Sequence, residues 1–380
     1  MYLLENNVDQ SKVLRTTTPN ESVLNVTKSY LPNKKKYQAY IDRIFDSHSL
    51  TNRGPLSQEL EQRLAEYLGV KHLLLVSNGT MALHVAYRLL GLRGEVITSP
   101  FSFAATSSSL VWEKLKPIYT DICSKSFNLN PRNIVSSITE RTSAIVPVHV
   151  FGNACAVDDI SQIAKEHGLK VIYDAAHAFN VRGPSKSLFE YGDISTLSLH
   201  ATKMFHTVEG GALVFNDADL YEQAKALINF GIDSTGTIAP LGINAKMSEF
   251  HAAMGLCVLD DIDIITEQRK KLVTQYRINF GGRLQLQLRN SDFTDNYAYL
   301  PVVFPNVVIR QAVELALGAE SINPRRYFSP SLNEVYAPYQ SMPNSQSLSE
   351  RVLCLPLYPG LSKRDVLRVT NIIHRTLDRF

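Results

Sequence analysis

Short apolar segments alternate with helical ones through the first two thirds of the chain, and this alternation constrains the fold more than any other feature. Strands are predicted at residues 72–76, 95–98, 118–121, 144–150, 171–174 and 196–199. Helical periodicity lies between several of them, as at 57–68 and 157–166. The pattern predicts an α/β fold in which helices cover both faces of a mostly parallel sheet. Segment 211–216 follows the last of these strands too closely for a helical crossover and predicts an antiparallel strand.

The length of the chain predicts more than one domain. Its 380 residues exceed the size at which a single core stops growing, and 44% of them are hydrophobic. The first forty-odd residues are polar and weakly patterned. After about residue 260 a long charged helix at 267–276 precedes a strand candidate at 297–304 and a final helix at 363–377. We expect an N-terminal arm or helix over 1–48, a large domain over 49–260 and a smaller α/β domain over 261–380.

Two residues at the ends of predicted strands are candidates for the chemistry. Lys203 follows strand 196–199 in the run Ser-Leu-His-Ala-Thr-Lys, where its amine could form a Schiff base with an aldehyde cofactor. Asp174 ends strand 171–174, where a buried carboxylate could keep the ring nitrogen of pyridoxal phosphate protonated. A surface lysine and an aspartate that caps the following segment are the alternatives. Both residues should meet at one edge of the sheet, where strand ends converge.

A third element could bind phosphate. Strand 72–76 runs into Ser-Asn-Gly-Thr at 77–80, and a helical pattern begins at once. Free amides at a helix start attract anions, and a glycine lets the backbone come close. A capped helix would give the same pattern. The segment lacks the lysine of a Walker loop and the three glycines of a dinucleotide fingerprint, which argues against a nicotinamide-dependent oxidoreductase.

Composition and charge exclude several other classes of protein. A net charge of +3 is nearly balanced, so we do not expect a nucleic-acid binder. The four cysteines are far apart and have neither metal-binding spacing nor disulfide-rich density, so we expect no metal site. Neither a membrane-spanning apolar stretch nor a signal-like N-terminus is found in the sequence. We therefore expect a cytoplasmic protein without a membrane partner.

These elements together resemble the DegT/DnrJ/EryC1/StrS family of nucleotide-sugar aminotransferases. The resemblance runs from about residue 50 to the C-terminus. Further motifs that carry it are Phe-Ser-Phe-Ala-Ala-Thr at 101–106, Pro-Val-His-Val-Phe-Gly at 147–152 and Gly-Ile-Asn-Ala-Lys-Met-Ser-Glu at 242–249. It implies a fold-type I aminotransferase, with a mixed, mostly parallel sheet between helices, a smaller C-terminal α/β domain, and pyridoxal 5'-phosphate as cofactor.

The resemblance implies a role for each matching residue around the cofactor ring. Lys203 would form the Schiff base and later move a proton between the amino donor and the cofactor. Asp174 would pair with the ring nitrogen, and His177 would lie near the ring and tune its electronics. Phe103 would stack on the ring.

The resemblance also implies how the cofactor phosphate is held. The amides of Gly79 and Thr80 and the hydroxyl of Ser198 would bind it. Asn244 would reach it from the neighbouring subunit, so the enzyme would be a homodimer with its active site at the interface. The family often has arginine at the position of Lys246, which cannot make the same paired contact.

The expected substrates are a nucleotide-linked keto sugar and L-glutamate as amino donor. The segment 323–330 lies where related enzymes place residues near the sugar nucleotide, which makes Arg325, Arg326 and Tyr327 substrate candidates; a surface role for both arginines is equally open. Within the family, the chain is most similar to enzymes of amino-sugar and O-antigen biosynthesis that convert dTDP-4-keto-6-deoxy-D-glucose to dTDP-4-amino-4,6-dideoxy-D-glucose.

Three alternatives stay open at this point. An aminotransferase acting at C3 of a dTDP-3-keto sugar would carry the same motifs. A dehydratase on this fold would replace the Schiff-base lysine, typically with histidine, and Lys203 argues against it. A non-catalytic homologue would be expected to lose Asp174 or Lys203, and both are present.

Overall fold

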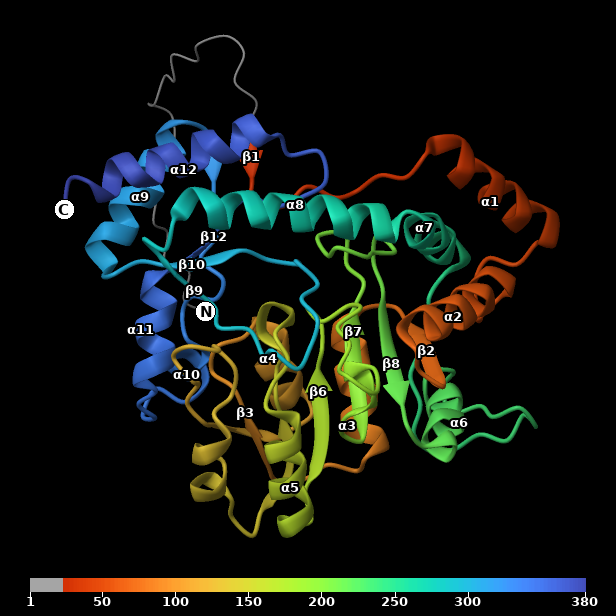
Figure 1. Ribbon diagram of the computed structural model, residues 1–380. Helices are drawn as coiled ribbons and strands as arrows, with labels where there is room; N and C mark the ends of the chain where they lie inside the picture. The colour runs from red at the N-terminus through yellow and green to blue at the C-terminus, as the bar shows by residue number, and fades with distance from the viewer. Residues whose placement is uncertain (1–22) are drawn as a thin grey trace, which may run out of the picture.

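The computed structural model describes residues 23–380, which are built around a seven-stranded sheet (Figure 1). In spatial order its strands are β2 (His72–Val76), β8 (Gly211–Phe215), β7 (Ile194–Ser198), β6 (Lys170–Asp174), β5 (Thr142–Val146), β3 (Glu95–Thr98) and β4 (Lys116–Tyr119). β8 runs antiparallel to β2 and β7, and the other neighbouring strands are parallel. The predicted mostly parallel sheet and the antiparallel strand after it are confirmed.

Helices cover both faces of this sheet, because its strands are apolar on both sides. In β2, Leu73 and Leu75 pack into one apolar cluster, and Leu74 and Val76 pack into another. The helices that contribute to the first cluster include α2 (Pro55–Leu68), α5 (Val157–His167) and α7 (Glu249–Asp260). Those that contribute to the second are α3 (Gly79–Leu89), α4 (Ala104–Trp112) and α6 (Ala218–Leu227).

Several strands differ from their predicted bounds by one or two residues, and β5 ends four residues earlier than predicted. The segment predicted as a strand at 144–150 forms β5 only as far as Val146, since Pro147 has no amide to continue the ladder, and beyond it an isolated parallel bridge joins Val148 to Asp174. A short 3-10 turn, Val150–Gly152, follows it. The strand predicted at 118–121 starts earlier, at Lys116, which pairs with Glu95 of β3.

The C-terminal part has an apolar cluster of its own. The helices α8 (Ile262–Phe280), α9 (Val307–Ala319) and α12 (Lys363–Leu377) pack with a small sheet of order β12-β10-β9. Its strands are β9 (Gln285–Leu286), β10 (Pro301–Val303) and β12 (Val352–Cys354), and the short helices α10 (Leu332–Tyr336) and α11 (Pro343–Arg351) lie between β10 and β12 in sequence. Figure 1 shows α8 crossing one end of the large sheet, with α9 and α12 beyond it. The final helix has the predicted bounds.

The strand predicted at 297–304 is much shorter than expected. β10 pairs only over Pro301–Val303. Tyr297 has a positive φ of 55°, which no strand tolerates, and the carbonyls of Tyr297 and Ala298 accept hydrogen bonds from the Arg269 side chain. The Arg269 side chain therefore binds backbone carbonyls that would pair with a neighbouring strand if β10 were longer.

The described residues before α2 contact both the large sheet's helices and the C-terminal part. β1 (Leu24–Asn25) pairs in parallel with β11 (Ile322–Asn323), and α1 (Lys34–Ser47) lies against α7. Residues 1–22 of the predicted arm lie outside the described residues. The division at 48 and 260 stays a prediction. Within residues 23–380, no helix combines the length and apolar character needed to cross a membrane.

Candidate active site

A cavity of about 380 Å³ lies at the carboxyl ends of β2, β6 and β7. Asp174 is the last residue of β6, Ser198 is the last of β7, and Gly79 begins α3 after β2. These three strands run in the same direction, so their ends meet at one edge of the sheet. The predicted site residues that line this cavity are Gly79, Thr80, Phe103, Asp174, His177, Ser198, Lys203 and Tyr327.

One end of the cavity offers unpaired backbone donors at the start of α3. The Asn78 side chain accepts from the Met81 amide at 2.9 Å, which leaves the preceding amides of Gly79 and Thr80 without a partner among the described residues. A Cβ added to Gly79 would lie 3.0 Å from Cβ of Ser198. The glycine therefore lets the helix start approach the Ser198 hydroxyl, and a phosphate there would meet two amides and a hydroxyl.

A buried carboxylate lies on another wall of the cavity. Asp174 accepts a hydrogen bond of 2.7 Å from the Thr106 hydroxyl and one of 3.1 Å from the Ala176 amide. Ser102 in turn donates to Thr106 at 2.7 Å. Burial raises the pKa of Asp174, although these donors and the nearby Lys203 offset part of that rise. The Asp174 carboxylate would therefore share a proton with any basic nitrogen that came within hydrogen-bond distance of it.

His177 follows β6 by three residues and is held neutral. Its Nδ1 accepts from the Phe151 amide at 3.2 Å, which assigns the ring proton to Nε2. Burial holds the pKa of His177 well below its ordinary value. The ring is nearly parallel to that of Phe328, with 3° between their planes and 5.6 Å between centroids. His177 can donate a hydrogen bond into the cavity, but it does not supply positive charge there.

The amine of Lys203 projects into the same space. Its Nζ donates to the hydroxyl of Tyr299 at 3.2 Å. Burial lowers the pKa of Lys203 to about 8, and attraction to the Asp174 carboxylate offsets part of the effect. With this pKa about a tenth of the amine is uncharged at pH 7, and the uncharged form is the one that attacks a carbonyl carbon.

The cavity also fits a flat aromatic ring. Phe103 lines it while 61% of the residue is exposed, so one face of its ring is open to a ligand. A ring that stacked there could reach the amine of Lys203, the carboxylate of Asp174 and the donors at the start of α3. These three groups match, in the same order, the aldehyde, the ring nitrogen and the phosphate of pyridoxal phosphate.

Three predicted residues do not line this cavity in the described chain. Asn244 is exposed on the surface of the chain. Arg325 is exposed too, and its backbone pairs with Cys354. Arg326 is half-buried, and its guanidinium donates to the Ser349 carbonyl at 3.3 Å. The roles predicted for these residues remain predictions.

Sequence reasoning missed three residues that the fold brings to the site. Ser102 and Thr106 lie in the segment 101–106 that was quoted for its aromatic residue; Ser102 precedes α4 and Thr106 lies in its first turn, where the two hydroxyls form a hydrogen bond. Tyr299 lies in the segment predicted as a strand at 297–304. Nothing local to that segment connects it to a lysine 96 positions earlier.

Comparison with known proteins gives a family and close relatives. The profile of the DegT/DnrJ/EryC1/StrS aminotransferase family matches residues 32–374. A dTDP-4-amino-4,6-dideoxy-D-glucose transaminase of Shigella dysenteriae is 39% identical over 358 residues, which cover 91% of this chain and 97% of that protein. A protein of the same description from Escherichia coli is 37% identical, with 93% and 99% covered.

Solved structures agree with these relatives. A crystal structure of DesI in the presence of its TDP-sugar product superposes with a TM-score of 0.90 at 34% identity, covering 95% of this chain and 94% of that one. Helicobacter pylori PseC, an aminotransferase of pseudoaminic acid biosynthesis, has a TM-score of 0.86 at 24% identity, covering 94% of this chain and all of the other. The second likeness supports the fold alone.

Proposed function

The chain belongs to the DegT/DnrJ/EryC1/StrS aminotransferase family, and from this premise we propose that it aminates a keto sugar linked to a nucleoside diphosphate. The reaction would convert dTDP-4-keto-6-deoxy-D-glucose to dTDP-4-amino-4,6-dideoxy-D-glucose with L-glutamate as amino donor and pyridoxal 5'-phosphate as cofactor. The observation that carries the proposal is a single cavity that holds the Lys203 amine, the Asp174 carboxylate and the open amides at the start of α3.

When bound, pyridoxal phosphate supplies an aldehyde that exchanges amino groups and a ring that accepts electrons. The residues of this chain would do the rest. The amides of Gly79 and Thr80 and the Ser198 hydroxyl would hold the phosphate, and Phe103 would cover the ring. Asp174 would keep a proton on the ring nitrogen, since Thr106 and the Ala176 amide fix the direction of its carboxylate.

Proton transfer would fall to Lys203. Its amine is free during each half of the reaction, and with a lowered pKa it can remove a proton from the α-carbon of the donor at neutral pH. The neutral His177 would donate a hydrogen bond to the ring side of the site. These assignments are supported by the shared cavity and by the burial that sets each protonation state.

The choice of the 4-keto sugar is supported by similarity. The Shigella and Escherichia relatives named for a 4-amino sugar are 39% and 37% identical to this chain. A 3-aminotransferase of Acidithiobacillus ferrooxidans, named for a UDP-linked sugar, is 29% identical. Amination at C3 therefore ranks second. A dehydratase ranks below both, because Lys203 is in place.

The donor carboxylate and the sugar diphosphate would need cationic partners. Arg325 and Arg326 are proposed for this role, since a guanidinium binds carboxylate or phosphate through paired hydrogen bonds. We also propose a homodimer in which Asn244 of one subunit reaches the phosphate of the other. Its exposure in the single chain supports that placement.

Spectroscopy of the purified protein with added pyridoxal phosphate tests the proposal. We expect visible absorbance from cofactor bound at Lys203, and its loss in Lys203→Ala. Incubation with L-glutamate and dTDP-4-keto-6-deoxy-D-glucose should give the 4-amino sugar, identified by magnetic resonance. Lys165→Ala, which removes an exposed lysine on α5, is the control and should behave as wild type.

Two outcomes would contradict the proposal. A wild-type protein without visible absorbance, or a Lys203→Ala variant that keeps both absorbance and product formation, would exclude Lys203 as the reactive amine. Turnover of a dTDP-3-keto sugar without turnover of the 4-keto sugar would instead establish the second candidate.

A further inference from the structure

The phenol of Tyr299 is the side-chain partner of the Lys203 amine. The two side chains come from segments 96 positions apart, and Nζ lies 3.2 Å from the phenolic oxygen. Nζ is also 5.8 Å from the centroid of the tyrosine ring, so the amine lies at the hydroxyl end of the ring. Both residues line the cavity.

We propose that Tyr299 is a positioning residue whose hydroxyl holds the ε-amino group of Lys203 in place whenever that amine is free. The inference rests on the proposed function for calling Lys203 the reactive amine. Lysine has four rotatable bonds, so a free amine would otherwise sample many rotamers between the two halves of a reaction. A fixed partner keeps the amine near the atoms between which it moves a proton.

Aromatic neighbours fix the plane of the Tyr299 ring. Its centroid lies 4.8 Å from that of His177 and 5.4 Å from that of Phe151, with tilts of 57° and 50°. Tyr327 packs edge-on against it at 6.1 Å. Rotation of the ring would disturb three side chains, so the hydroxyl has a defined direction.

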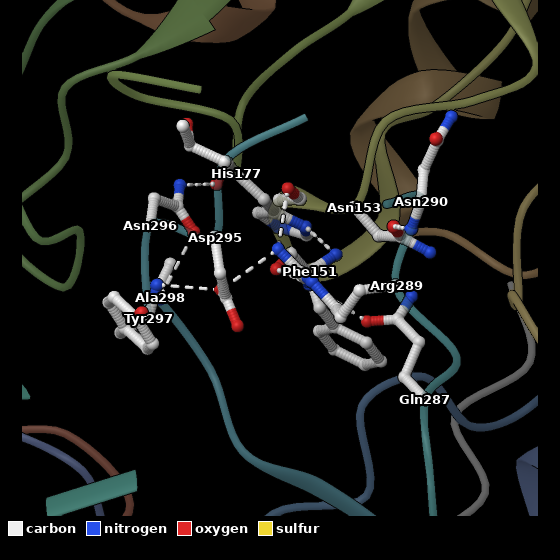
Figure 2. Close-up of polar contacts among 12 residues, drawn as sticks. Phe151, Asn153, His177, Gln287, Arg289, Asn290, Asp295, Asn296, Tyr297 and Ala298 are labelled. Carbon is white, nitrogen blue, oxygen red and sulfur yellow. Dashed lines mark hydrogen bonds and ion pairs between the residues drawn. The ribbon is translucent and has the colours of Figure 1, made fainter. Parts of the chain in front are cut away.

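The backbone before Tyr299 is held from two sides. Arg269 of α8 donates to the carbonyls of Tyr297 and Ala298, at 2.9 and 2.5 Å. Asn296 donates to the carbonyls of His177 and Phe179, at 2.8 and 3.0 Å, as Figure 2 shows for the first of these. Tyr299 is therefore attached both to α8 and to the turn that carries His177.

Arg289 adds a second link to the same region. Its guanidinium donates to the carbonyls of Phe151 and Gly152, at 3.1 and 2.8 Å, and forms an ion pair of 3.0 Å with Asp295 (Figure 2). In the same turn, the amide of Phe151 donates a hydrogen bond to Nδ1 of His177. Segment 289–298 thus fixes His177 and Tyr299 relative to one another.

A phenol suits this task better than a carboxylate would. Burial raises the pKa of Tyr299, so the hydroxyl keeps its proton at any physiological pH. It can accept from the protonated amine and donate to the neutral one, whereas an ionised carboxylate can only accept and would favour the charged amine. The bond to the charged amine is the stronger of the two.

The charged and titratable side chains that face Lys203 from the surrounding elements bear on any pH measurement. Those that line the cavity with it are Asp174, His177, His200, Glu209, Tyr299 and Tyr327. Of these, Asp174 favours the charged amine. Each stays in place in the variants used below, except Tyr299 itself.

The test measures the reactivity of Lys203 in protein freed of cofactor. An amine-directed reagent is applied over a pH series, and the labelled peptide is quantified by mass spectrometry. In Tyr299→Phe the charged amine loses its hydrogen-bond partner. We therefore expect the labelling midpoint, the pH at which labelling of Lys203 is half-maximal, to fall by about 0.5 to 1 pH unit. Tyr299→Leu, which also lacks the hydroxyl, should shift it in the same direction.

Tyr276→Phe is the matched control. Its phenol donates to the Pro356 carbonyl at 3.1 Å within the C-terminal cluster, so this variant also loses one buried hydroxyl. Its labelling midpoint should stay at the wild-type value. A midpoint unchanged in both Tyr299 variants, or lowered equally in Tyr276→Phe, would overturn the inference. Since no cofactor is present, this result is independent of whether the visible absorbance expected for a transaminase is found.

Discussion

Burial sets the charge of each reactive group at the scale of single residues. It raises the pKa of Asp174, lowers that of Lys203 to about 8 and holds that of His177 far below its ordinary value. The three groups share one cavity, yet each has a different set of hydrogen-bond partners. Groups whose environments separate their protonation states in this way are suited to acid and base roles at one pH.

Replacement of Asp174 by asparagine tests the electrostatic part of this arrangement. The amide keeps the size of the side chain but cannot stabilise a positive ring nitrogen. We expect pyridoxal phosphate still to bind through Gly79, Thr80 and Ser198, while turnover falls by at least about a hundredfold. Steady-state rates and cofactor absorbance measure the two effects separately.

Asp159→Asn is the control, since Asp159 is exposed on α5. Its turnover should match that of wild type. Near-normal turnover in Asp174→Asn would show that the ring nitrogen does not depend on this carboxylate.

At the scale of elements, the start of α2 depends on a residue far away in sequence. Gly54 precedes this helix and has no side chain to cap it. The buried carboxylate of Glu249, at the start of α7, accepts instead from the amides of Leu56 and Ser57, at 2.7 and 2.9 Å, and from the Ser57 hydroxyl at 2.5 Å. A Cβ on Gly54 would lie 2.8 Å from Cδ of Glu249, so the glycine makes room for the contact.

Glu249→Gln should therefore destabilise the fold. One carboxylate oxygen becomes an NH2 group that faces an amide donor, and the negative charge at the helix start is lost. We expect a cost of about 2 kcal/mol, seen as a melting temperature lower by about two to three degrees. Differential scanning calorimetry measures it.

Glu59→Gln on the exposed side of α2 is the comparison. It removes an exposed ion pair with Arg43, which contributes about 0.5 kcal/mol or less. Equal melting temperatures for the two variants would show that the Glu249 contact does not hold α2 in place.

At the scale of the whole molecule, one proposed ligand lies away from the site of its own chain. Asn244 is exposed, and Ile243 beside it is 43% exposed. Leu241 and Ile238 nearby are exposed as well. An apolar, exposed segment next to the proposed phosphate ligand is consistent with the homodimer proposed above, in which each subunit completes the site of its partner.

Mixing two inactive variants tests this arrangement. Lys203→Ala and Asn244→Ala homodimers should each have little activity. Because half of randomly mixed dimers would contain one of each chain, and such a dimer has one intact site, we expect about a quarter of wild-type activity after mixing. No recovery would show that Asn244 serves its own chain.

Most of the residues predicted from the sequence line the cavity, because they lie at or near the ends of elements that local periodicity identifies. Asp174 and Ser198 end apolar strands, and Gly79 begins a helix. Tyr299 had no such signal. Its segment looked like a strand, whereas the positive φ of Tyr297 and the hydrogen bonds made by Arg269 and Asn296 give the backbone before Tyr299 a different course.

The sequence by itself thus determined the order of strands and helices, the family and the residues at the strand ends, because apolar periodicity and short motifs are local properties of the chain. The tertiary structure alone decided which distant groups meet. Tyr299 reaches Lys203 across 96 positions, and Glu249 reaches Ser57 across 192. A hydrogen bond depends on distances of a few tenths of an ångström, and these are set by the packing of whole elements rather than by any pattern along the chain.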